Sequence, residues 1–275
     1  MTRDNSILEL GSATRTRVAL GTGRTKVIVP IIAANASALI AQVAALNSVR
    51  PAELDSVRPA AAPATADVVE WRIDHFENAL DENAVLAAAT ELRAATDLPI
   101  LATFRTEEEG GAAPAEPPAY ADLLVALAES GNIDALDVQM FFDAGTVEGI
   151  IAAAHAANCT VIGSFHDFSA TPSEGSIVAR LAGIAAGGAD LAKVAVMPSS
   201  KRDVLTLLAA LDVASRTLEI PVIAISMGEL GTLSRIATVA FGGCATFASA
   251  GQVSAPGQLD AAQLRPLLDY LDQVL

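Results

Sequence analysis

The chain has 275 residues, of which 52% are apolar and 18% charged, and this composition excludes global disorder and permits a large buried core. Seventeen basic and 32 acidic side chains give a formal net charge of −15, so nucleic acid and anionic membrane surfaces would repel the protein. We therefore expect no nucleic-acid partner and no membrane partner. An anionic small molecule would need a local cluster of arginine or lysine.

Cysteine and histidine usage argues against disulfides and metal binding. Cys159 and Cys244 have no zinc-type spacing, and the three histidines show no HxxxH pairing. No basic segment followed by an apolar core opens the sequence, so no secretory signal is expected and a cytoplasmic location is predicted. Residues 27–46 are apolar, but Pro30 and several polar residues favour a strand, a turn and a helix over a membrane span.

Short apolar runs alternate with alanine- and leucine-rich stretches of helical periodicity along the chain. The expected strands cover 26–33, 67–73, 99–105, 135–140, 160–168, 190–198, 221–227 and 244–250. The expected helices that follow them cover 37–49, 82–96, 119–131, 146–158, 173–188, 201–218, 231–241 and 259–275. Continuous apolar strands separated by helices indicate a parallel sheet that is covered on both faces.

Eight strand–helix units in about 250 residues predict an α/β fold of the (β/α)₈ TIM barrel type. A doubly wound open sheet is the alternative, but no GxGxxG follows the first strand. The fragment GTGRTK (21–26) precedes that strand, so it cannot be a P-loop that opens a helix. Residues 1–25 are expected to form an N-terminal hairpin or cap that closes the barrel floor. Residues 47–66 contain SVRPA twice and are interpreted as a surface insertion in a single catalytic domain, 1–275.

Reactive groups of such a barrel lie at the carboxyl ends of its strands. The polar residues expected there are Glu70, Arg72, Arg105, Glu107, Glu108, Glu109, Asp137, Gln139, His166, Asp167, Lys193, Arg235, Ser254 and Gln258. Taken singly, most have a structural explanation: the three glutamates fit a solvated loop, and Asp137 and Gln139 fit hydrogen-bonding positions in the barrel interior.

Lys193 is different, because it interrupts the apolar strand DLAKVAVMP (190–198). Burial disfavours the ammonium form, and an imine-forming nucleophile must be a free amine. With His166 on the adjacent strand and several arginines nearby, this lysine fits a small carboxylate that carries a carbonyl group. The reaction classes that remain open are aldol cleavage, transaldol transfer and dehydration next to a ketone.

Six motifs together resemble type I 3-dehydroquinate dehydratase, the Schiff-base enzyme of the shikimate pathway. They are EWRIDHF (70–76), TFR with EGG (103–111), FHDF followed by TP (165–172), AKVAVMP (192–198), MGELGTLSR (227–235) and SAPGQL (254–259). They follow the order of the family and extend from about residue 21 to the end of the chain.

The resemblance implies a lyase that dehydrates 3-dehydroquinate to 3-dehydroshikimate, a step of chorismate and aromatic amino acid biosynthesis. It implies that Lys193 forms the imine, that His166 is the general acid and base, and that Glu109 orients His166. It assigns substrate binding to Glu70, Arg72, Arg105, Arg235, Ser254 and Gln258. No metal and no external cofactor are implied, since the lysine itself supplies the electron sink. A homodimer is favoured.

Two features depart from the pattern of the family. Pro30 stands at the end of the first barrel strand, where some relatives have a serine, and the 47–66 connection is long. Two competing functions are another class I aldolase-type barrel acting on a keto acid, and a non-catalytic barrel that binds a metabolite. The aldolase would need a glycine-rich phosphate site, for which FGGCATFASAG (241–251) is weak support, and a binding protein would have no need of the Lys193, His166 and Glu109 set.

Overall fold

Eight parallel strands form the centre of the computed structural model, which describes residues 7–12, 14–48, 65–140, 142–251 and 254–275. In the order of the sheet they are β10 (Ala245–Phe247), β3 (Lys26–Ile31), β4 (Val68–Arg72), β5 (Ile100–Thr103), β6 (Ala135–Gln139), β7 (Thr160–Asp167), β8 (Leu191–Val196) and β9 (Val222–Ser226). A backbone hydrogen bond of 3.0 Å from Cys244 to Val222 connects the two outer strands, so the sheet curls into a barrel. The predicted TIM-barrel fold is confirmed.

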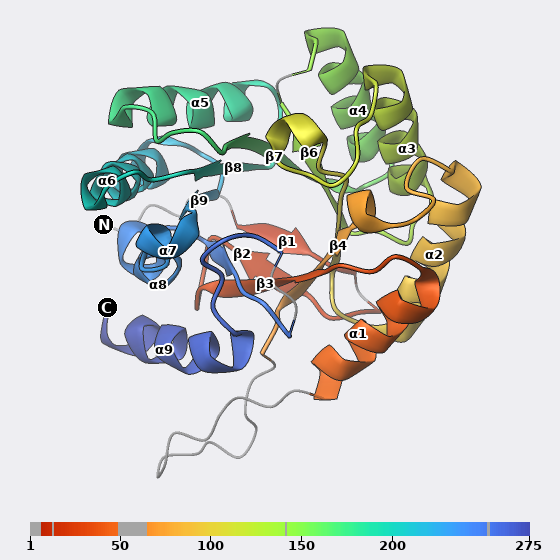
Figure 1. The fold of residues 1–275 in the computed structure, drawn as a ribbon, viewed down its shortest axis with the longest axis horizontal. Helices are drawn as coiled ribbons and strands as arrows, with labels where there is room; N and C mark the ends of the chain where they lie inside the picture. Colours follow the sequence, from red (N-terminus) through yellow and green to blue (C-terminus); the bar gives the residue numbers. More distant parts are fainter. Residues whose placement is uncertain (1–6, 13, 49–64, 141, 252–253) are drawn as a thin grey trace.

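Helices surround this barrel on the outside (Figure 1). They are α1 (Ala36–Ser48), α2 (Glu82–Ala95), α3 (Pro117–Glu129), α4 (Ala144–Ala156), α5 (Glu174–Ala186), α6 (Lys201–Thr217) and α9 (Ala261–Val274). Several begin at a side chain that accepts a backbone N–H of the first turn, as Asp81 and Asp143 do, and Ser200 forms a reciprocal capping box with Asp203. The outward side chains of the strands pack against the apolar helix faces and form the larger core.

One expected helix is wrong in its form. Residues 231–241 do not make a continuous helix, because the segment is divided into α7 (Gly228–Gly231), α8 (Ser234–Ala237) and a 3-10 turn, η3 (Thr238–Phe241). The Ser234 hydroxyl accepts the backbone N–H of Ser226 and donates to the Gly231 carbonyl, which holds the segment against the end of β9. A side chain at Gly231 would come within 2.2 Å of the Ser226 carbonyl oxygen, so only glycine permits this close approach.

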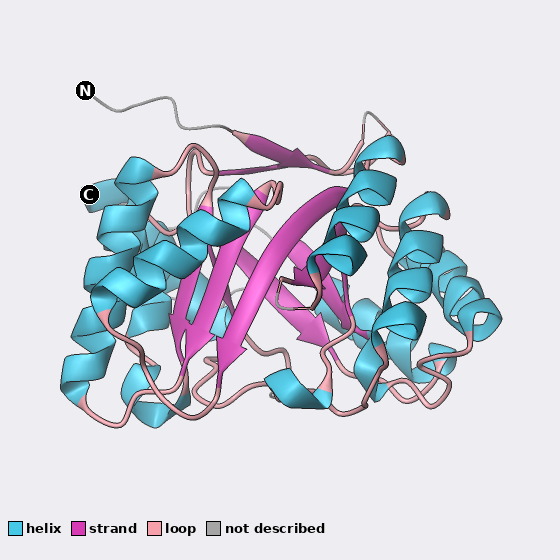
Figure 2. Ribbon diagram, turned by 90° about the horizontal axis from the view of Figure 1, so that it is seen from above, coloured by secondary structure: helices cyan, strands magenta, loops and turns pink. Residues whose placement is uncertain are grey.

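The barrel floor is covered by an antiparallel hairpin, β1 (Leu8–Leu10) and β2 (Val18–Leu20), as Figure 2 shows. Leu10, Val18 and Leu20 pack against a layer of apolar side chains to which each of the eight barrel strands contributes. That layer consists of Ile28, Val68, Leu101, Ala135, Ile162, Leu191, Ile223 and Ala245. The hairpin therefore seals the amino ends of the strands with aliphatic contacts.

An ion-pair cluster at the same end attaches the C-terminal helix to the barrel. Arg265 of α9 is fully buried and pairs with Asp67, whose carboxylate also accepts the backbone N–H of Val27 at 2.8 Å. Arg24 approaches the other oxygen of Asp67 at 2.6 Å. These contacts stabilise the closed end of the barrel and lie away from its carboxyl ends.

Most of the predicted 47–66 insertion lies outside the described residues. Within the described ranges, no helix combines the length and the apolar character that crossing a bilayer requires.

Candidate active site

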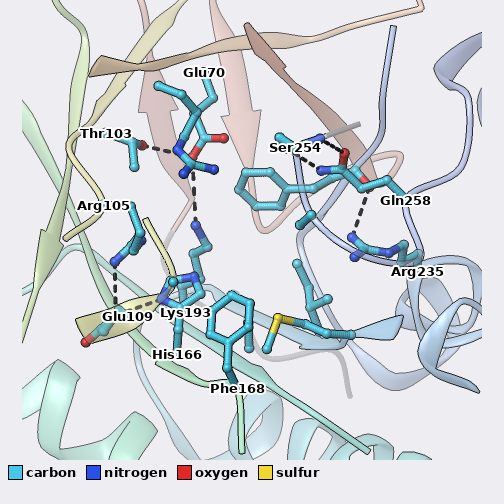
Figure 3. A pocket seen from close by; sticks show the side chains of 17 residues that line it. Glu70, Thr103, Arg105, Glu109, His166, Phe168, Lys193, Arg235, Ser254 and Gln258 are labelled. Atoms are coloured by element: carbon cyan, nitrogen blue, oxygen red, sulfur yellow. Dashed lines mark hydrogen bonds and ion pairs between the residues drawn. The ribbon is translucent and has the colours of Figure 1, made fainter. Parts of the chain in front are cut away.

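A pocket opens at the carboxyl ends of the strands, and side chains of many different elements converge on it (Figure 3). The structure brings together all nine predicted site residues around it: Glu70, Arg72, Arg105, Glu109, His166, Lys193, Arg235, Ser254 and Gln258. Thr103, Gly110, Phe168, Ala195, Ile225, Met227, Phe247 and Ala255 complete its lining.

The strand alternation explains why polar groups gather here. Positions two residues beyond the apolar floor layer also face the barrel axis, and on five adjacent strands they are polar. These positions are Glu70, Thr103, Asp137, Ser164 and Lys193, all of them buried. The barrel thus changes from an apolar floor to a polar layer within one repeat of the strand.

Lys193 is buried, but its nitrogen is not surrounded by apolar groups. Nζ lies 2.9 Å from Oδ2 of Asp137, 4.0 Å from Oε1 of Glu70 and 4.3 Å from the centre of the Phe247 ring. Its apolar sequence neighbours, Ala192 and Val194, point outward into the core beneath the helices. Two carboxylates therefore face the amine, and the apolar neighbours of Lys193 in sequence do not indicate them.

Arg105 connects this lysine environment to the histidine. Its guanidinium lies 2.6 Å from Oδ1 of Asp137 and 3.1 Å from Oε2 of Glu109. Burial alone would lower the pKa of Arg105, but the two carboxylates raise it above its usual value. Burial likewise opposes ionisation of Asp137, yet Arg105 and Lys193 hold the pKa of that carboxyl well below its usual range.

His166 and Glu109 form a hydrogen-bonded pair, with 2.9 Å between Nδ1 and Oε2. Burial, and then the cations of Arg105 and Lys193, lower the pKa of His166 well below 6.5. Burial raises the pKa of Glu109 to about 7, against the opposing influence of Arg105. The histidine is consequently neutral at pH 7 and is able to accept a proton.

Arg72 and Glu70 are each held by a neighbouring side chain. Asp74 accepts two hydrogen bonds from Arg72, at 2.8 and 2.7 Å, and also accepts the backbone N–H of Ala112. The Thr103 hydroxyl donates to Glu70 at 2.8 Å. Both functional groups are therefore fixed in place before any substrate arrives.

Arg235 lies across the pocket from the lysine and is 1% exposed (Figure 3). Its guanidinium donates to the backbone carbonyls of Phe247 and Pro256, and Nε has no hydrogen-bond partner within the described residues. No ion pair joins it to a carboxylate of that part of the chain, and burial lowers its pKa to about 10. A buried cation held only by neutral acceptors is suited to an incoming anion.

Ser254 and Gln258 contact each other next to Arg235. The Gln258 amide oxygen accepts the Ser254 backbone N–H at 2.9 Å, and its nitrogen donates to the Ser254 hydroxyl at 2.8 Å. The two side chains thus close a small loop after β10, and both residues line the pocket.

The EGG motif has a steric explanation. Gly110 has φ +78°, and a Cβ there would lie 2.4 Å from the Phe168 ring, while a Cβ at Gly111 would lie 1.7 Å from the Arg105 carbonyl oxygen. Both glycines let the loop that carries Glu109 pass close to its neighbours. Phe168 is 41% exposed and forms part of the pocket wall.

The described residues offer no metal centre, since no group of three or more metal-ligating side chains lies together among them. Cys159 and Cys244 are both buried free thiols, and burial raises the pKa of each to about 12. Neither thiol is a reactive nucleophile at neutral pH.

Comparison with known proteins places this pocket in a family. The sequence model of a family described as type I 3-dehydroquinase matches residues 29–274, which is most of the chain. The chain belongs to the type I 3-dehydroquinase family. The recognition made from the six sequence motifs is confirmed.

Individual 3-dehydroquinate dehydratases agree with this assignment. The chain is 41% identical over 255 residues to the 3-dehydroquinate dehydratase of Lactiplantibacillus plantarum, covering 92% of this chain and 95% of that one. It is 44% identical over 210 residues to the Klebsiella pneumoniae enzyme, covering 76% and 84%. The crystal structure of the Clostridium difficile type I enzyme matches with a TM-score of 0.87 and 33% identity, covering 98% of this chain and all of that one.

Asp137, Thr103 and Phe247 are the contributors to this site that sequence reasoning missed or undervalued. Asp137 carried a signal, a carboxylate in the middle of an apolar strand, but it was interpreted only as a hydrogen-bonding residue of the interior. Thr103 opens the TFR motif, but a threonine or a phenylalanine in a strand is typical of ordinary packing, so neither Thr103 nor Phe247 is assigned to the site by residue type.

Proposed function

We propose that Lys193 is the nucleophile with which this protein dehydrates 3-dehydroquinate to 3-dehydroshikimate. Membership of the family confirms the predicted activity, that of a carbon–oxygen hydro-lyase that forms a Schiff base. The observation that carries the residue-level proposal is the buried Lys193 nitrogen, which lies in one pocket with the His166–Glu109 pair.

The amine of Lys193 attacks the C3 ketone, and loss of water leaves a protonated imine. That cation draws electrons from C2, so the C2 proton becomes acidic and its removal gives an enamine. The enamine then expels the hydroxyl group at C1. A second water hydrolyses the imine, which releases 3-dehydroshikimate and restores the amine.

His166 is the proposed acid and base for these proton transfers. It takes the C2 proton and returns a proton to the departing C1 hydroxyl, which leaves as water. Ionised Glu109 accepts the Nδ1 hydrogen of His166, and this arrangement leaves the lone pair of Nε2 free for the substrate. Glu109 is thus a positioning residue for the histidine.

The remaining residues are proposed to bind the substrate. Arg235 pairs with its carboxylate, because the guanidinium is buried and has only neutral acceptors. The ring hydroxyls are assigned to the polar side chains around the rest of the rim: Glu70, Arg72, Arg105, Ser254 and Gln258.

Borohydride reduction in the presence of 3-dehydroquinate tests the proposal. We expect one stable substrate-derived mass on the peptide that contains Lys193, and none in Lys193→Ala, which should fold normally but lose turnover. His166→Ala should still trap substrate, slowly. Dehydration by Lys193→Ala at near wild-type rates would refute the assigned nucleophile, and trapping of a sugar acid in place of 3-dehydroquinate would indicate the aldolase alternative.

The finer predictions of a homodimer, a cytoplasmic location and a single catalytic domain remain part of this proposal. Light scattering of the purified protein would decide the first, with a mass of two chains expected. The crystal structure of the Clostridium difficile relative was determined with covalently modified comenic acid, and this supports the proposal that the present chain also reacts covalently with a small molecule.

A further inference from the structure

Asp137 has the most buried carboxylate of the site and the most direct contact with the proposed nucleophile. It lies in the middle of β6, its side chain is completely shielded from solvent, and it lies 2.9 Å from the Lys193 nitrogen. The proposed reaction gives this carboxylate no part, so its position calls for an explanation.

The two oxygens of Asp137 have separate partners. Oδ2 faces Lys193, while Oδ1 accepts hydrogen bonds from Arg105 and from the Ser164 hydroxyl, each at 2.6 Å. When Lys193 gives up its proton to the proposed base, His166, the carboxylate therefore keeps a cation and a hydroxyl as partners. The lysine becomes a neutral amine without leaving an unpaired buried charge, which would be costly.

From this arrangement we infer that Asp137 is a further catalytic residue, whose carboxylate serves as the counter-ion of the Lys193 nitrogen throughout the imine cycle. The inference rests on the proposed role of Lys193. No proton passes to Asp137: it accepts N–H hydrogen bonds from the ammonium, the amine and the protonated imine in turn, and it remains ionised in each state.

Charge placement around the nitrogen supports this choice of counter-ion. Among the described residues the other carboxylate paired with Lys193 is Glu70, but it is 4.0 Å away and its nearer oxygen already accepts the Thr103 hydroxyl. Phe247 offers only the weaker attraction of a ring face. Arg105 and Lys193 together keep the pKa of the Asp137 carboxyl low, so it is an anion at neutral pH.

The contacts of Asp137 also explain why the lysine end and the histidine end of the site are connected. Arg105 pairs with Asp137 through one nitrogen and with Glu109 through another, and Glu109 holds His166. A positive charge on the Lys193 nitrogen is therefore balanced by Asp137. The same arginine, Arg105, pairs with both Asp137 and Glu109. Neutralising Asp137 should disturb imine formation first and proton transfer second.

If Asp137 had only a structural role, its substitution would lower the thermal stability and leave the kinetic constants near those of the wild type. Asp134 provides the matched control. Asp134 precedes the same strand at the barrel floor, pairs with Arg93 at 2.9 Å, and its side chain is only 7% exposed. Asp134→Asn removes a poorly exposed, arginine-paired carboxylate remote from the pocket. It should lower the thermal stability while the kinetic constants remain near those of the wild type.

The experiment compares wild type, Asp137→Asn and Asp134→Asn in three measurements: thermal unfolding, steady-state kinetics, and the rate at which borohydride traps 3-dehydroquinate on the enzyme. For Asp137→Asn we expect about a 100-fold loss in kcat and in the trapping rate, with KM changed by less than about threefold. If Asp137→Asn traps substrate at the wild-type rate, Asp137 is not the counter-ion and the inference fails.

If Asp137→Asn folds poorly, a second variant still tests the inference. Asp137→Ala leaves room for a small carboxylate, so added formate should restore at least a tenfold increase in trapping, while chloride at equal ionic strength should not. Absence of formate rescue in a folded Asp137→Ala protein would also overturn the inference. Wild-type enzyme that traps no substrate would instead refute the proposed function, so the two failures are distinguishable.

Discussion

Glu109 holds His166 through a 2.9 Å hydrogen bond, and burial shifts the pKa values of the two residues in opposite directions. The histidine is neutral over the physiological range, while the pKa of Glu109 lies at about 7. The charge of the pair therefore changes near neutral pH by ionisation of the glutamate. This assignment reverses the usual expectation that the histidine is the titrating member.

The activity should follow this ionisation. Protonated Glu109 donates to Nδ1 and leaves the hydrogen of the ring on Nε2, so the histidine cannot act as a base toward the substrate. We expect kcat to rise as pH increases through about 7, and Glu109→Gln to lose that rise along with about 10- to 100-fold of kcat. Glu108→Gln, an exposed neighbour, is the control and should keep the wild-type profile. An unchanged profile in Glu109→Gln would assign the titration to another group.

The raised pKa of Glu109 should also appear in the pH dependence of protein stability. The folded-state pKa of Glu109 is raised from 4.5 to about 7, so its favourable contribution is present below pH 4.5 and is lost as pH rises toward 7. Relative to wild type, Glu109→Gln should gain up to about 3 kcal/mol of unfolding free energy between pH 4.5 and pH 8. Urea unfolding of both proteins across this range measures the difference. A difference that does not vary with pH would show that Glu109 has an ordinary pKa.

Arg235 should lower the stability of the substrate-free protein and strengthen substrate binding. Its cation is buried with only carbonyl partners, so Arg235→Gln should unfold at the same or a higher temperature than wild type. The same variant should raise KM about 100-fold, with a smaller effect on kcat, because the carboxylate clamp is lost. Calorimetry should show that 3-dehydroshikimate, which keeps the carboxylate, stabilises wild type but not the variant. Equal stabilisation of both would place the carboxylate elsewhere.

Gly110 allows a direct test of how the EGG loop shapes the pocket. Gly110→Ala and Gly131→Ala both introduce a side chain at positive φ, but only the first meets another group, the Phe168 ring at 2.4 Å. We expect Gly131→Ala to cost about 1 kcal/mol of stability, and Gly110→Ala to cost about 1–3 kcal/mol more and to raise KM as Phe168 is displaced. Urea unfolding and steady-state kinetics provide both numbers. Equal costs at the two positions would mean that Phe168 moves aside freely.

The barrel could be predicted from sequence because its signals are local and repeated. Each strand is a short apolar run, and each helix that follows has its own period and often its own capping residue, as with Ser200 and Asp203. The expected helix at 231–241 failed for a non-local reason. The contacts of Gly231 and Ser234 with the end of β9 divide the segment, and helical periodicity does not encode such contacts.

The site was predictable where a polar residue stands out in an apolar strand, and less so where partners come from different strands. Lys193 was identifiable by its neighbours in sequence, but those neighbours face the other side of the sheet. The groups that surround its nitrogen come from β4, β6 and β10, and only the closed barrel brings them together. For this reason the sequence alone does not predict that Asp137 contacts Lys193.

The hairpin at the barrel floor has a consequence for how the protein is handled. Leu10, Val18 and Leu20 shield a ring of aliphatic side chains from all eight strands. A chain shortened to begin at β3 would keep every group of the pocket, yet it would expose that ring to solvent as a contiguous apolar patch. Such a truncated protein should self-associate and precipitate, so the residues most remote from the chemistry govern whether the enzyme is obtained in soluble form.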